Sequence, residues 1–206
     1  MLELVQRAHA KQTRNDGRVP YWMHLLSVAQ ILDRALEQGG ELADDVLRED
    51  LYVAGLGHDL YEDTAVQPDD VKLRFGERVD GWIRGMTNEG GDQQRAAYLA
   101  RMTEAPEEVR LLKLADLTEN SASVSYAIPD MGLAWARDVF LPIATEMRDV
   151  VHGTKFARYP RTAAMLGALL DHNYERLRRN IEMFELAEAS AKKPGPGKQP
   201  NSGKAP

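Results

Sequence analysis

The recurrence of apolar residues at helical spacing is the feature that most constrains how this chain can fold. In "YWMHLLSVAQILDRALEQGG", apolar residues stand at Leu25 and then three, four and seven positions further along, at Val28, Ala29 and Leu32. The segment closes on Gly39–Gly40, a typical helix end. Strand-like alternation is scarce elsewhere in the sequence. We therefore predict an all-α fold.

Four further helices are predicted, over residues 50–60, 68–76, 105–124 and 161–189. The second and third of these begin with a proline and acidic residues, the polarity expected at a helix N-terminus. The glycines at 55 and 57 weaken helix propensity but permit close backbone approach. The last residues, ending in "KKPGPGKQPNSGKAP", contain no large apolar side chain. We predict one domain over residues 1–190 and a disordered Pro/Gly/Lys-rich tail over residues 191–206.

Composition narrows the classes of protein that fit. The chain has 206 residues, 43% of them hydrophobic, which suffices for one sizeable core. It has no cysteine, and no apolar run approaches the roughly 20 residues that span a bilayer. A net charge of −6 argues against extended nucleic-acid binding. These features predict a cytoplasmic protein with no membrane segment.

The stretch "LGHDLYEDT" places a histidine and three carboxylates at the end of an apolar segment. No Lys or Arg lies between Arg48 and Lys72, so a balancing cation must come from distant sequence or be a metal ion. One imidazole and one carboxylate side by side, His58 and Asp59, suit Mn, Fe, Co, Ni or Zn better than calcium. An ordinary solvated helix end is the alternative.

Two other segments carry polar groups in apolar surroundings. His24 opens the apolar helix described above, although a lone histidine there is more often a core or surface residue. Asp116 follows a run that is apolar apart from Lys113, with which it could form a salt bridge. Asn120 lies four residues further, on the same helix face.

Taken in order, these segments resemble the HD-domain phosphohydrolases. More narrowly, they are similar to the (p)ppGpp hydrolase domain of the RelA/SpoT proteins and to the small alarmone hydrolases. "AHAKQTRNDGRVPYWMH" resembles the family pattern "AH..Q.R..G.PY..H", and "GHDLYEDT" matches "HD..EDT". "FGERVDGWIRGMT" and "KLADLTEN" resemble "FG..V..LV.GVT" and "KLAD...N". The resemblance covers about residues 2–125.

This resemblance implies an all-α HD-domain helical bundle around a single metal ion, usually Mn²⁺, with other transition metals possible. The implied metal ligands are His24, His58, Asp59 and Asp116. Two imidazoles and two carboxylates cancel the charge of a dication and leave positions open for water and a phosphate oxygen.

The same resemblance gives catalytic roles to Glu62 and Asp63, three and four residues beyond Asp59. If the helix continues past Asp59, both lie one turn further along, outside the ligand set, where they could take a proton from water.

Phosphate groups need local positive charge in an acidic protein. Arg14 and Lys113 lie in the matched segments, and Arg137 lies about where the family carries another phosphate-contacting arginine. Asn120 is implied to lie in the nucleotide site. We therefore expect substrate contacts from Arg14, Lys113, Asn120 and Arg137.

The expected function is a (p)ppGpp 3′-pyrophosphohydrolase that releases pyrophosphate and GDP or GTP. The family usually has Arg or Lys after "AD", where this chain has Leu117, and Pro after the first-motif His, where it has Leu25. These departures leave two alternatives open: an HD nucleotidase or phosphodiesterase for another nucleotide, and a catalytically silent binding module. The expected partner is a small nucleotide, and the sequence identifies no protein partner.

Overall fold

Helices account for the regular structure of this protein. The computed structural model describes residues 1–88, 90 and 94–191, and in that part of the chain there is no strand, only an isolated bridge between Thr13 and Pro20. None of these helices combines the length and the apolar character that crossing a bilayer requires. The all-α prediction is confirmed. The predicted tail lies outside the described residues except for Ala191, which is still helical.

The helices follow one another along the chain with short connections. They are α1 (Leu2–Ala8), α2 (Trp22–Gly39), α3 (Asp45–Gly57), α4 (Leu60–Asp63), α5 (Pro68–Phe75), α6 (Glu77–Met86), α7 (Arg95–Glu104), α8 (Glu107–Met131), α9 (Leu133–Trp135), the π-helical turn η2 (Ala136–Phe140), α10 (Leu141–Gly153) and α11 (Pro160–Ala191).

Helix α2 forms as its apolar spacing predicts. The four apolar residues at positions 25, 28, 29 and 32 are all completely buried. The helix ends at Gly39, and Gly40 adopts the left-handed conformation (φ 62°) that glycine tolerates at a helix C-terminus. The apolar stripe of α2 thereby faces the core, and its first turn, which carries His24, is fixed relative to that core.

Helix α3 is displaced from its predicted range. It begins at Asp45, because the Asp44 side chain accepts a hydrogen bond from the backbone N–H of Leu47 at 3.0 Å. It ends at Gly57 rather than near residue 60. The chain then turns through His58 and Asp59, and α4 starts at Leu60. The helix therefore does not continue through the acidic residues, which lie on a separate short turn.

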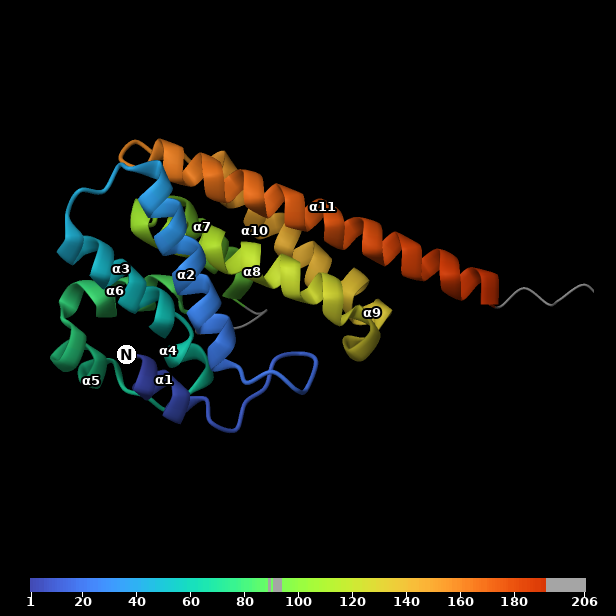
Figure 1. Cartoon of the computed structure of the whole chain (residues 1–206), viewed down its shortest axis with the longest axis horizontal. Coiled ribbons are helices and arrows are strands. Elements are labelled where there is room, and N and C mark those ends of the chain that lie inside the picture. The colour runs from blue at the N-terminus through green and yellow to red at the C-terminus, as the bar shows by residue number, and fades with distance from the viewer. Residues whose placement is uncertain (89, 91–93, 192–206) are drawn as a thin grey trace, which may run out of the picture.

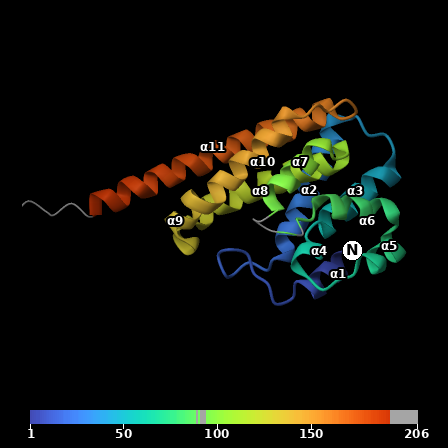
Figure 2. The same ribbon diagram turned by 180° about the vertical axis from the view of Figure 1, so that it is seen from behind.

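Helix α8 occupies the centre of the molecule. It contacts α2, α6, α10 and α11, and Figures 1 and 2 show α11 running alongside it and continuing past its end. Its residues Leu111, Leu112, Leu114 and Ala115 are at most 2% exposed. A helix covered on most sides carries its polar residues into the interior as well. Asp116 is consequently only 5% exposed.

Close contact between α2 and α3 depends on the absence of a side chain at Gly55. A Cβ atom there would lie 3.0 Å from Ala29 Cα and 3.2 Å from Ala29 Cβ. Gly81, in the middle of α6, has no heavy atom within 4 Å of the corresponding position. The two glycines thus offer a matched pair of helical sites, one crowded and one open.

We expect Gly55→Val to lower the free energy of unfolding by about 1–3 kcal/mol, because overpacking forces the two helices apart. Gly81→Val should change it by no more than about 0.5 kcal/mol. Urea denaturation of both variants measures the difference. Equal effects of the two substitutions would contradict the close α2–α3 contact.

Candidate metal centre

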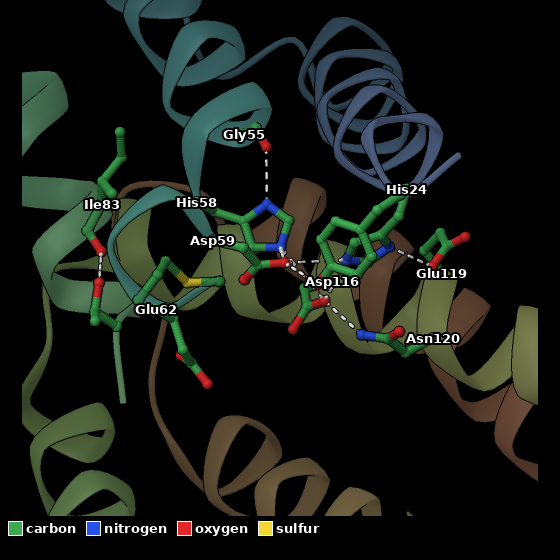
Figure 3. Close-up of polar contacts among 12 residues, drawn as sticks. His24, Gly55, His58, Asp59, Glu62, Ile83, Asp116, Glu119 and Asn120 are labelled. Atoms are coloured by element: carbon green, nitrogen blue, oxygen red, sulfur yellow. Dashed lines mark hydrogen bonds and ion pairs between the residues drawn. The ribbon is translucent and has the colours of Figure 1, made fainter. Parts of the chain in front are cut away.

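The four predicted ligands converge on one point (Figure 3). His58 Nε2 lies 3.2 Å from Asp59 Oδ2 and 3.7 Å from Asp116 Oδ1. His24 Nε2 lies 3.6 Å and 3.3 Å from the same two oxygens. We call these four residues the His/Asp cluster. Both histidines are at most 2% exposed, whereas the side chain of Asp59 is 19% exposed, so solvent reaches the otherwise buried cluster at Asp59.

Three separate parts of the fold supply the cluster. His24 comes from the first turn of α2, His58 and Asp59 from the junction of α3 and α4, and Asp116 from the middle of α8. Residues almost a hundred positions apart therefore meet only because α2 and α3 pack on each other and on α8.

Hydrogen bonds fix the orientation of both imidazole rings. His58 Nδ1 donates to the carbonyl oxygen of Gly55 at 2.9 Å, one turn earlier in the chain. His24 Nδ1 donates to Glu119 Oε2 at 2.5 Å. Because an acceptor holds each Nδ1 proton, the neutral form of each ring presents the Nε2 lone pair to the cluster, as a metal-binding histidine requires.

The charges of the cluster act strongly on one another. Burial disfavours the charged imidazolium of His58, but the carboxylates of Asp59 and Asp116 outweigh it and raise the pKa of His58. Burial opposes ionisation of Asp116 as well, yet Lys113 and the two histidines hold the pKa of Asp116 far below its ordinary value. The carboxylates thus stay ionised in a place where a positive charge is needed.

The donor set of the cluster fits a divalent transition metal. His58 Nε2 is buried and makes no hydrogen bond within the described residues, although two carboxylate oxygens lie within 3.7 Å of it. One donor atom each from His24, His58 and Asp59 lies within 4.8 Å of the others. Two ligands that each stand about 2.0–2.2 Å from one ion lie roughly 3–4 Å apart, which matches the separations measured across the cluster.

Asp116 is held from both sides of its carboxylate. Lys113 Nζ donates to Oδ2 at 2.8 Å, so the salt bridge considered from the sequence is present. Asn120 Nδ2 donates to Oδ1 at 2.6 Å from the next turn of α8. Oδ1 is also the atom that faces the two histidines. The salt bridge and a ligand role are therefore compatible, because they use different oxygen atoms.

Glu62 and Asp63 lie on α4, next to the cluster but outside it. Glu62 Oε2 accepts a hydrogen bond from the backbone N–H of Asn88 at 3.0 Å. Partial withdrawal from water is the main cause that raises the pKa of Glu62 and that of Asp63, and the charge of Asp59 adds to it. A carboxylate with a raised pKa is a better proton acceptor than an ordinary one.

Two cavities open on different sides of the cluster. One, of about 280 Å³, is lined by Glu62, Lys113, Tyr98 and Leu117 among others. The other, of about 230 Å³, is lined by His24, Arg14, Glu119 and Ser123 among others. Figure 3 shows Glu62 on one side of the cluster and Glu119 with Asn120 on the other.

Arg14 and Arg137, both predicted to bind substrate, differ in where their partners lie. Arg14 Nη2 contacts Glu119 Oε2 at 2.9 Å and Asn120 Oδ1 at 3.0 Å, at the edge of the smaller cavity. Arg137 pairs with Asp138 at 2.6 Å and with Glu185 at 3.1 Å, and neither of these carboxylates belongs to the cluster or its two cavities. Arg14 thus adjoins the cluster, whereas a role for Arg137 stays a prediction.

Sequence reasoning missed two residues that touch the cluster. Glu119 orients His24 and pairs with Arg14. Tyr21 donates its hydroxyl proton to Asp59 Oδ2 at 2.7 Å, and burial with the charge of Asp59 raises the pKa of Tyr21. Glu119 carried a weak signal, since it stands three residues after Asp116 on the same helix. Tyr21 lies in the quoted "PY" pair, but nothing in the sequence indicated its partner.

Comparison with known proteins agrees with this geometry. A guanosine-3′,5′-bis(diphosphate) 3′-pyrophosphohydrolase of Aquifex aeolicus is 32% identical over 124 residues, which cover 57% of this chain but 16% of that protein. MESH1 of Drosophila melanogaster, which bears the same enzyme name, is 26% identical over 150 residues, 71% of this chain and 79% of that protein.

A solved structure of a metazoan SpoT orthologue described as hydrolysing ppGpp shares the fold. Its TM-score is 0.65 at 24% identity, over 85% of this chain and 92% of that one. The family model for the HD domain matches residues 2–145, the segment that contains the entire His/Asp cluster. The chain therefore belongs to the HD-domain family.

Proposed function

We propose that this protein is a metal-dependent phosphohydrolase that removes the 3′-pyrophosphate of (p)ppGpp and leaves GDP or GTP. The observation that carries the proposal is the convergence of two imidazoles and two carboxylates on one buried point, with two more carboxylates beside it. HD domains hold a divalent metal, and the cluster supplies donors of the right kind. Relatives that align over most of their length carry the same enzyme name.

His24, His58, Asp59 and Asp116 would hold the ion. We propose Mn²⁺, the ion that the family resemblance implies, and the mixed nitrogen and oxygen donors are compatible with it as with other transition metals. When bound, the ion supplies Lewis-acid activation of water and of the scissile phosphate. The protein contributes fixed imidazole orientations through Gly55 and Glu119. Such partners keep donor atoms aimed at one point without rearrangement.

Glu62 and Asp63 act as proton acceptors for the attacking water. Both stand on α4 directly after Asp59, and neither forms a salt bridge with a lysine or arginine among the described residues. Their raised pKa values bring them nearer to the pKa that suits a general base at neutral pH. Asp59, by contrast, has a lowered pKa and suits a ligand role.

(p)ppGpp carries phosphates on both sides of its ribose. The two cavities could each receive one end of such a substrate. Lys113 borders the cavity beside Glu62, and Arg14 borders the one beside His24. We assign the leaving pyrophosphate to the Lys113 side and the nucleoside to the Arg14 side, where Asn120 is also at hand. Phosphate binding by Arg14 requires exchange of its bond to Glu119.

A different nucleotide is the second candidate. Leu117 lines the cavity beside Glu62, at the place where the resembling family usually carries a basic residue. With leucine in place of a basic residue, the cavity has one positive charge fewer to bind a second pyrophosphate. This favours a substrate with fewer phosphates. A silent binding module is disfavoured, because the cluster and both acids are present together.

The metal assignment predicts that His58→Ala abolishes retention of a divalent ion. The control is His152→Ala, which removes a histidine that pairs with Asp171 outside the cluster. Metal analysis of both purified variants after Mn²⁺ loading provides the measurement. Full metal content in His58→Ala would remove this residue from the ligand set.

The division of roles predicts that Glu62→Gln and Asp63→Asn retain the metal and lose turnover. Loss of a general acid–base group typically lowers the rate about 10²–10⁴-fold. Metal content and initial rates are measured on the same preparations. An empty metal site in either variant would make that residue a ligand rather than a proton acceptor.

The substrate assignment predicts that ppGpp is hydrolysed faster than GTP, deoxynucleoside monophosphates and cyclic dinucleotides. All are compared at equal concentration with Mn²⁺, and release of pyrophosphate or phosphate is followed. Faster turnover of any other nucleotide would favour the second candidate. No turnover of any of them, with metal bound, would favour a binding module.

A further inference from the structure

His9, in the connection after α1, is a buried imidazole with no part in the proposed chemistry. Its side chain is completely inaccessible to solvent. Nδ1 is 2.5 Å from Gln12 Oε1, and Nε2 makes no hydrogen bond within the described residues. Burying an imidazole nitrogen without a hydrogen bond costs free energy of folding.

Gln12 connects His9 to the acidic turn. Gln12 Nε2 donates to the backbone carbonyl oxygen of Asp63 at 2.8 Å, across 51 positions of sequence. Because a carbonyl oxygen only accepts, the amide must point its nitrogen at Asp63 and its oxygen at His9. His9 must then donate from Nδ1. The imidazole thereby fixes which end of the Gln12 amide faces the acidic turn.

His9 also contacts Tyr21, which binds Asp59 at the N-terminal end of α4. The His9 ring stacks on the Tyr21 ring with 5.1 Å between centroids and 29° between planes. The Tyr21 hydroxyl donates to Asp59 Oδ2, and its backbone N–H donates to the Gln12 carbonyl at 3.0 Å. His9 therefore contributes to the contacts on Asp59 and, through Gln12, to those on Asp63.

Helix α4 needs such support because it has only four residues. A single helical turn is unstable on its own, since nucleation costs more than one turn of hydrogen bonds returns. Within the turn, the Thr64 hydroxyl donates to the Leu60 carbonyl at 2.6 Å. Contacts from outside α4 must then decide where the Asp63 side chain stands relative to the cluster.

We propose that His9 and Gln12 are positioning residues that hold Asp63 at its working distance from the His/Asp cluster. This inference rests on the proposed role of Asp63 as a proton acceptor. Their hydrogen bonds go to each other and to the Asp63 carbonyl rather than to the His/Asp cluster. A displacement of about 1 Å at a reacting group can lower the rate about 10²-fold. We expect an effect on kcat of up to this size.

Gln12→Glu is the sharpest test of the link. The substituted side chain has the same shape and still accepts from His9, but it has no proton to donate to the Asp63 carbonyl. We expect kcat for ppGpp to fall about 10- to 100-fold, with KM and bound Mn²⁺ unchanged. Hydrogen exchange of the backbone amides over residues 60–64 should become faster.

Gln67→Glu serves as the matched control. Gln67 Nε2 also donates to a backbone carbonyl, that of Ala65, at 3.0 Å, but on the exposed approach to α5. The same loss of a donor there should leave kcat and exchange over residues 60–64 as in the unsubstituted protein. A matching fall in both variants would mean that added charge, and not the lost bond, is responsible.

The part played by His9 is separated with two further variants. His9→Phe keeps a ring to stack on Tyr21 but removes the Nδ1 donor, and should reproduce the Gln12→Glu effects. His9→Asn places an amide donor near the former Nδ1 position and should recover part of kcat. Failure of the asparagine to improve on phenylalanine would assign His9 a packing role only.

The two proposals fail in different ways. If the unsubstituted protein hydrolyses no nucleotide, the proposed function is wrong, and the exchange rates over residues 60–64 still decide whether His9 and Gln12 hold the turn. If turnover is present while Gln12→Glu changes neither kcat nor exchange, the positioning role is overturned. Loss of Mn²⁺ in Gln12→Glu would overturn it too, because the effect would then reach the cluster directly.

Discussion

Two carboxylates and two imidazoles held out of water at one point are the constraint on which the rest of this structure depends. Asp59 and Asp116 remain ionised there because cationic groups surround them. Lys113 donates to one oxygen of Asp116, and the second oxygen of that carboxylate is turned towards the histidines. When both histidines are neutral, as metal ligation requires, Lys113 balances one of the two carboxylates, and the remaining negative charge is the physical case for a metal ion.

The same helix provides both the core and the centre of the site. Leu111, Leu112 and Ala115 of α8 pack against several other helices, and Asp116 is the next residue along. The position of Asp116 is therefore set by the packing of the whole molecule. A side chain on such an element has a fixed position, since moving it would disrupt many apolar contacts.

The acidic pair is supported in a different way. Glu62 and Asp63 stand on a short turn that carries one fully buried apolar residue, Leu60. Hydrogen bonds reach the acidic pair from outside the turn: the backbone N–H of Asn88 contacts Glu62, and the side chain of Gln12 contacts the Asp63 carbonyl. Hydrogen bonds are directional, so they define the placement of two carboxylates that packing alone would leave loose.

The sequence by itself determined the helical class, the long helices and the residue types of the site. Apolar spacing identified α2 and α11 nearly to their ends, and the His-Asp pair with Asp116 pointed to metal chemistry. These features are local, because helical periodicity and neighbouring metal-ligand side chains can be recognised within one short segment of sequence.

The tertiary structure alone decided which distant groups meet. It ended α3 at Gly57, so that His58 and Asp59 lie at a break between helices rather than within one. It also brought Glu119 to His24 and Tyr21 to Asp59, partners that stand 95 and 38 positions apart. Such contacts follow from how helices pack against one another, and that packing is a property of the whole chain rather than of any segment.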